Sequence, residues 1–147
     1  MKCKILAVAL ATLATGAVAG PFDGFKGKMK PGMYETKMQM QIPGMPAGMG
    51  AQNMTFQNCV TQQDIDAGQM GKREGSPKDC EIKNFKMSGN TATYTMECTG
   101  DTKMKADNVI TFRDGGYTMD MKMAMNQGGQ VMNMTQKMEA RYLGPCK

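Results

Sequence analysis

Between Tyr117 and Tyr142 the chain alternates methionine with polar residues on both sides of a glycine pair, and this pattern constrains the fold more than any other feature. A period of two is the period of a strand, in which successive side chains point to opposite faces. Gly128 and Gly129 can take positive φ at both central positions of a two-residue hairpin loop. The sequence therefore predicts a β-hairpin with methionine on one face of both strands.

The glycine pair also predicts the register of this hairpin. With the pair as the loop, Met125 lies opposite Met132, and Met123 lies opposite Met134. A slip by one residue would place polar side chains on the methionine face and is disfavoured. Because directly paired residues share a face, seven methionines are expected in one patch: Met119, Met121, Met123, Met125, Met132, Met134 and Met138.

Residues 1–19 have the features of a secretory signal peptide. Two lysines precede an apolar run from Ile5 to Ala19, and the run ends in the small residues Ala17-Val18-Ala19. The run is too short to span a bilayer as a helix, and no later stretch is apolar enough to do so. We expect cleavage after Ala19 and a periplasmic or secreted mature protein without a membrane span.

The mature chain is expected to fold as one all-β domain over residues 34–147, after an irregular lead-in over residues 20–33. Strands are predicted at 34–42, 53–60, 80–87, 91–99 and 102–113, followed by the two strands of the methionine hairpin. Thr61 and Asp64 can cap one short helix at about residues 62–70. About seven strands with tight turns predict a single antiparallel meander, curled into a barrel or half-barrel that buries one face.

The turn at Gly115-Gly116 extends the methionine face to a third strand, with Ile110 opposite Met121 and Ala106 opposite Met125. For the predicted hairpin of strands 80–87 and 91–99, two registers stay open. A three-residue loop at 88–90 places Cys80 opposite Cys98, whereas a two-residue loop at Gly89-Asn90 offsets the two cysteines and pairs Phe85 with Tyr94.

Four cysteines remain after removal of the signal peptide, and an even number in an exported chain indicates two disulfides. In a strict meander three of them lie near one end of the sheet. We therefore favour the pairing of Cys59 with Cys80 and of Cys98 with Cys146.

Several strings of the chain resemble the bacterial exported family called domain of unknown function 3617. They are KPGMYE at 30–35, CVTQQD at 59–64, SGNTATYTMECTG at 88–100 and MTQKMEARYLGPC at 134–146. The family often has tryptophan where Tyr34 and Tyr94 stand in this chain. The resemblance implies an exported, mostly β domain with paired cysteines, and it brings no activity with it.

The residue types that are missing argue against an enzyme. The sequence has no histidine, which excludes imidazole-based triads and proton shuttles. Oxidised cysteines cannot act as thiolate nucleophiles. Asp64 and Asp66 are two residues apart on the expected helix, and residues with this spacing do not face each other. Removing Lys2 and Lys4 with the signal lowers the formal charge from +5 to +3, which is too weak and scattered to indicate nucleic acid.

Methionine is the remaining signal, and four interpretations of it stay open. It could serve as the hydrophobe of the core, as a sink for oxidants, or as the lining of a barrel that accepts an apolar ligand or a protein partner. The fourth is a soft-metal site for Cu(I) or Ag(I), because uncharged, polarisable thioethers prefer such ions. The candidate ligands are the methionines that share strand faces: Met38, Met40, Met119, Met121, Met123, Met125, Met132 and Met134.

Overall fold

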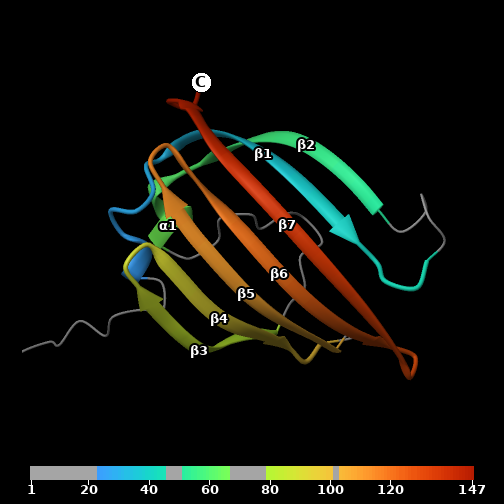
Figure 1. The fold of residues 1–147 in the computed structure, drawn as a ribbon. Coiled ribbons are helices and arrows are strands. Elements are labelled where there is room, and N and C mark those ends of the chain that lie inside the picture. The colour runs from blue at the N-terminus through green and yellow to red at the C-terminus, as the bar shows by residue number, and fades with distance from the viewer. Residues whose placement is uncertain (1–22, 46–50, 67–78, 101–102) are drawn as a thin grey trace, which may run out of the picture.

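The structure, a computed structural model, describes residues 23–45, 51–66, 79–100 and 103–147 (Figure 1). The signal peptide expected over residues 1–19 lies outside the described residues, and so do residues 67–70 of the expected helix. The described chain is mainly β-strand, as the alternating patterns predicted.

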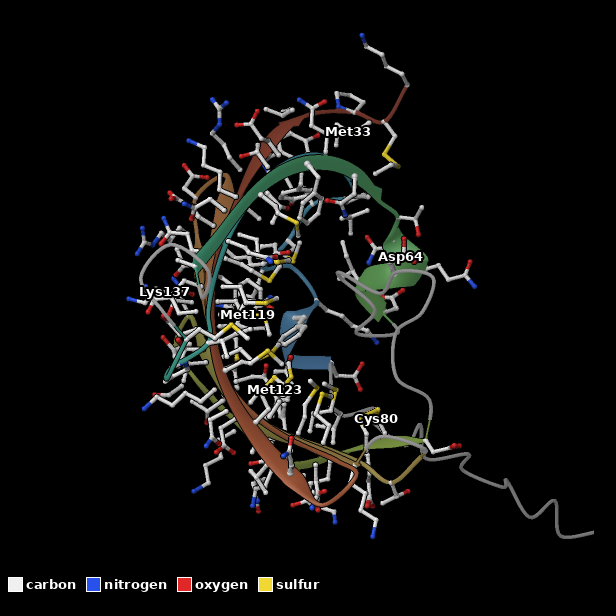
Figure 2. All side chains as sticks on the ribbon, turned by 90° about the vertical axis from the view of Figure 1, so that its right-hand side faces the viewer. Met33, Asp64, Cys80, Met119, Met123 and Lys137 are labelled. Atoms are coloured by element: carbon white, nitrogen blue, oxygen red, sulfur yellow. A yellow bond between two sulfur atoms is a disulfide. The ribbon has the colours of Figure 1, made fainter. Side chains whose placement is uncertain are left out.

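Seven antiparallel strands form a single sheet: β1 (Gly32–Gln41), β2 (Ala51–Val60), β3 (Cys80–Ser88), β4 (Thr91–Cys98), β5 (Lys103–Arg113), β6 (Gly116–Gln127) and β7 (Gln130–Gly144). The strand order is β2-β1-β7-β6-β5-β4-β3, so that β2 and β3 are the edges of an open sheet. The sheet curls, with the 3₁₀ helix η1 (Asp23–Phe25) and the helix α1 (Gln62–Asp66) on its concave side (Figures 1 and 2). The expected antiparallel meander curled into a half-barrel is confirmed.

The core lies on the concave side, where η1 and α1 contact the sheet. Phe25 of η1 is 1% exposed, and its ring meets the ring of Phe112 edge-on with centroids 5.0 Å apart. The lead-in, which we expected to be irregular, therefore forms a short 3₁₀ helix and contributes Phe25 and Met29 to the core. The buried cluster consists of Phe25, Met29, Tyr34, Val60, Ile65, Ala92, Ile110, Phe112, Tyr117 and Ala140. Aromatic and branched side chains dominate it, and methionine is a minor component.

The cysteines pair differently from our expectation. Disulfides join Cys59 to Cys146 and Cys80 to Cys98, so the pairing that we favoured is wrong. Its premise fails because β2 and β3 occupy opposite edges of the sheet, which separates Cys59 from Cys80. The strand β1 lies between β2 and β7, where Met33 pairs with Cys59 on one side and with the end of β7 on the other. This arrangement brings the C-terminal tail to the end of β2.

The β3–β4 hairpin combines the two registers that the sequence left open. Its turn has two residues, since Ser88 pairs with Thr91, and Cys80 nevertheless lies opposite Cys98. A register shift within β3, where Asn84 has a φ of 54°, makes up the difference of one residue. The bulge thus allows both the tight turn and the disulfide.

The turn between β5 and β6 begins one residue earlier than the sequence indicated. We expected Gly115-Gly116 as the loop, but Asp114-Gly115 forms it. The pairing is therefore shifted by two residues, which keeps every side chain on its expected face. The observed pairs are Ile110 with Met119, Ala106 with Met123 and Met104 with Met125.

Gly116 is needed for a close approach between strands and not for the turn. A Cβ atom on Gly116 would collide with the carbonyl oxygen of Ala140 in β7. We expect the substitution Gly116→Ala to lower the free energy of unfolding by about 1–3 kcal/mol, because the backbone of β6 or β7 would have to shift. Urea denaturation followed by circular dichroism measures the loss.

Gly24→Ala is the matched control for this substitution. A Cβ at Gly24 would meet its nearest atom, Cγ of Met87, at an ordinary contact distance of 3.5 Å. We expect a change below about 0.5 kcal/mol, as for other substitutions without a steric clash. Equal losses at the two glycines would contradict the close-approach explanation.

Candidate methionine site

Methionines from all seven strands share the concave face of the sheet, and we call this set the methionine face. Figure 2 shows Met119 and Met123 directed to the concave side and Lys137 directed away from it. The strand registers place the remaining members on the same face. The set is Met38, Met40, Met54, Met87, Met96, Met104, Met119, Met121, Met123, Met125, Met132, Met134 and Met138.

The densest part of this face is the β6–β7 hairpin, whose predicted register is confirmed. Met123 pairs with Met134, and Met125 pairs with Met132. We call these four residues the methionine quartet. Paired Cβ atoms on neighbouring strands lie about 5 Å apart, and residues two apart on one strand lie about 7 Å apart. Flexible thioether side chains on such a rectangle can bring their sulfur atoms together.

Solvent reaches the quartet without any movement of the backbone. Met132 is 41% exposed, and the other three members are half-buried. Met104 of β5 pairs with Met125 and is 6% exposed, so it closes one side of the quartet. Among the described methionines, Met29 and Met104 alone are buried. Most members of the face are therefore partly accessible to solvent, and Met104 alone among them is buried.

Two predicted site residues, Met38 and Met40, lie apart from the quartet. β7 separates them from β6, so that Met38 pairs with Met138, and Met40 pairs with Gln136. The amide of Gln136 donates a hydrogen bond from Nε2 to Sδ of Met138 at 2.9 Å. The eight candidates thus fall into separate groups on one face and do not form a single cluster.

Met119 and Met121, the other predicted site residues, occupy the middle of the face. Met119 lies between Met138 and Ile110 and packs against the buried cluster. Met121 lies between Gln136 and Asn108. The core interpretation of methionine therefore holds for Met119, whereas it does not account for the quartet.

Asn108 is a polar residue within this face that the sequence did not single out. It is 2% exposed, and its Nδ2 donates to the carbonyl oxygen of Ala106 at 3.1 Å. Its Oδ1 has no hydrogen-bond partner among the described residues. The neighbouring Tyr94 has a pKa raised to about 12 by burial, so its phenol is neutral at physiological pH. The polar groups in the middle of the face are uncharged.

The two carboxylates of the expected helix, Asp64 and Asp66, have structural partners. Asp64 accepts hydrogen bonds from the backbone N and from Oγ1 of Thr61, at 2.8 and 2.6 Å, and these bonds lower its pKa. The backbone N of Asp64 in turn donates to Oγ1 of Thr61. This is the expected cap of α1. Asp66 accepts a hydrogen bond from Gln62 at 3.0 Å. The two aspartates thus have different partners at the helix.

Charged metal ligands do not gather anywhere in the described part of the chain. In it, no group of three or more histidine, cysteine, aspartate or glutamate side chains is placed to hold a metal ion. None of its helices is long and apolar enough to cross a membrane. Two disulfides occupy the four cysteines of the domain. Thioethers are therefore the soft donors that remain.

Comparison with family models assigns the chain to a family. The model of a family described as "Protein of unknown function (DUF3617)" matches residues 29–146. Searches of curated proteins and of solved structures found no significant match.

Proposed function

The chain belongs to DUF3617, a family of unknown function, so membership assigns no activity, and from the geometry we propose that the methionine quartet binds Cu(I) or Ag(I). The observation that carries the proposal is the pairing of Met123 with Met134 and of Met125 with Met132 on one accessible face. Four thioethers from two neighbouring strands can supply three or four ligands to a single ion.

The chemistry of the donors favours this class of metal. Thioether sulfur is uncharged and polarisable, and it binds Cu(I) in preference to Zn²⁺ or to hard cations. Thioethers need no deprotonation, unlike thiolate, imidazole or carboxylate ligands. Uptake by the quartet is therefore expected to vary little with pH between about 5 and 8, where histidine sites lose their metal as the imidazole is protonated.

We further propose that the protein is exported and acts by binding and not as an enzyme. The sequence has the signal-peptide pattern over residues 1–19 and no histidine. Two disulfides are compatible with an oxidising compartment outside the cytoplasm. In such a compartment the cysteines are oxidised and thioethers remain available to Cu(I).

An anaerobic Cu(I) titration of the mature, oxidised protein against a competing chelator tests the proposal. The variant Met123→Leu/Met125→Leu/Met132→Leu/Met134→Leu removes the four sulfurs and nearly preserves side-chain volume. We expect the wild-type protein to take up one equivalent and the variant to bind at least about 100-fold more weakly, since most of its ligands are lost. Circular dichroism and thermal unfolding establish that the variant is folded.

The matched control replaces four methionines of the same face outside the quartet: Met38→Leu/Met40→Leu/Met54→Leu/Met87→Leu. This variant is expected to keep the affinity of the wild-type protein. Equal affinity of the wild-type protein and the folded quartet variant, or no uptake by either, would refute the quartet as a metal site.

A second candidate function is the binding of a flexible apolar ligand on the concave face. It is favoured by the exposure of methionine there, since Met54 and Met132 are 42% and 41% exposed. Adaptable methionine surfaces bind apolar partners of varied shape. In that case the two leucine variants would both retain the ligand, because leucine preserves the apolar surface.

A further inference from the structure

A hollow lies away from the methionine quartet, between the lead-in and the β5–β6 turn. It has a volume of about 330 Å³. We call it the cationic cavity. It is lined by residues 27–30, Tyr34 of β1, Asn90 of the β3–β4 turn, residues 112–116 and Tyr142 of β7. The lining segments are therefore far apart in the sequence.

The inner wall of the cationic cavity is apolar. Met29, Tyr34 and Phe112 are 6%, 2% and 3% exposed and belong to the buried cluster. Tyr142 packs edge-on against Tyr34, with ring centroids 5.4 Å apart. Burial raises the pKa of the Tyr34 phenol, which therefore stays neutral. Tyr142 is half-buried, so its ring is the part of this wall that a planar or aliphatic group can contact.

Hydrogen bonds fix the segments that form the cavity. The hydroxyl of Tyr34 donates to the carbonyl oxygen of Lys30 at 2.9 Å. The backbone N of Phe112 donates to the carbonyl oxygen of Asn90 at 2.8 Å, and the backbone N of Tyr142 donates to that of Gly115 at 2.7 Å. These bonds join the lead-in and two turns to the sheet, so the cavity is largely formed before any ligand binds.

The rim of the cavity carries an excess of positive charge. Lys28, Lys30 and Arg113 line it together with one carboxylate, Asp114. Lys28 donates a hydrogen bond from Nζ to Oδ1 of Asn90 at 2.7 Å, and this neutral partner leaves its charge uncompensated. Within the described residues, no ion pair joins any of these four side chains to another residue.

From this combination of an apolar wall and a cationic rim, we propose that the cavity binds a small organic anion. The ligand would place an aromatic or short aliphatic body against Tyr142, beside the buried Tyr34 and Phe112. Its carboxylate, sulfonate or phosphate group would accept charge-assisted hydrogen bonds from Lys30 and Arg113. The proposal does not depend on the metal site, because the two sites share no residue.

Two fluorescent probes with the same ring system test the proposal. Anilinonaphthalene sulfonate carries a negative charge, and N-phenylnaphthylamine lacks the sulfonate. We expect the anionic probe to bind at least about tenfold more tightly, as one charge-assisted contact provides. Affinity for the anionic probe should fall when NaCl is raised to about 0.5 M, because salt screens exposed charges.

Variants locate the binding site of the anionic probe. The variant Lys30→Gln/Arg113→Gln is expected to bind the anionic probe about tenfold more weakly and to keep its affinity for the neutral probe. The control variant Lys122→Gln/Lys137→Gln removes the same charge from exposed positions on β6 and β7. Figure 2 shows Lys137 pointing away from the concave side. This variant should keep its affinity for both probes. The quartet leucine variant should also leave both probes unaffected.

Three results would overturn the proposal. The first is equal affinity for the two probes. The second is a loss of affinity for the anionic probe in the Lys122→Gln/Lys137→Gln control that equals the loss in Lys30→Gln/Arg113→Gln. The third is a loss of affinity for the anionic probe in the quartet variant, which would place the binding site of that probe on the methionine face. Circular dichroism of each variant verifies that the fold is retained, so that a loss reports on binding.

Discussion

Removal of the disulfide between Cys59 and Cys146 is expected to lower the free energy of unfolding by about 4–5 kcal/mol. The two cysteines are 87 residues apart, so their bond closes a loop that includes most of the domain and restricts the unfolded chain strongly. The variant Cys59→Ala/Cys146→Ala avoids new free thiols. Urea denaturation of the wild-type and variant proteins under non-reducing conditions measures the difference.

The second disulfide provides the internal control. Cys80 and Cys98 are 18 residues apart, and the variant Cys80→Ala/Cys98→Ala is expected to lose about 3 kcal/mol, since the loop is shorter. A larger loss for this pair than for the long-range pair would contradict the explanation from loop length. It would indicate that the contacts of β3 with β4 dominate.

The substitution Phe25→Ala is expected to lower the free energy of unfolding by about 3–5 kcal/mol, the range for a fully buried phenylalanine. Phe25 is 1% exposed and contacts the rings of Phe85 and Phe112, with centroids 5.8 and 5.0 Å away. Its loss would leave a cavity between η1 and the sheet. Urea denaturation gives the change in free energy.

Leu143→Ala is the control for this prediction, because Leu143 is also a large hydrophobic residue but is 42% exposed. We expect it to cost less than about 1 kcal/mol. A similar cost at both positions would show that η1 contributes little to the stability of the domain.

The sequence predicted the β6–β7 hairpin because its signals are local. Alternation defines the two strands, and Gly128 and Gly129 both have positive φ, at 62° and 85°. The β5–β6 turn was misplaced because Gly115 could be combined with a residue on either side. In the structure Gly116 lies in β6, close to the carbonyl oxygen of Ala140 in β7, and this contact with a distant strand has no local signal.

The order of the strands and the disulfides could not be derived from local patterns. A local reading places β2 next to β3, whereas the pairing of Tyr34 with Tyr142 sets β1 beside β7. That pairing depends on a contact between the beginning and the end of the domain. The role of Phe25 was missed for a similar reason, because a glycine-rich lead-in gives no periodic signal.

The candidate site was predicted in part. The four quartet residues follow from the hairpin register alone, and this register is confirmed. Met104 was not recognised as a neighbour of the quartet because the expected β5–β6 register placed Ala106 opposite Met125. Met38 was grouped with the quartet because a shared face does not reveal how many strands lie between two residues.

The two disulfides lie at opposite borders of the open sheet. One joins β3 to β4, and the other links β2 across β1 to the tail that follows β7. Edge strands are normally the first to fray and offer unpaired backbone groups to other chains. Here each border strand is covalently tethered, so opening from the sides is restrained as long as the thiols stay oxidised. Resistance to strand exchange between molecules is therefore linked to the redox state of the surroundings.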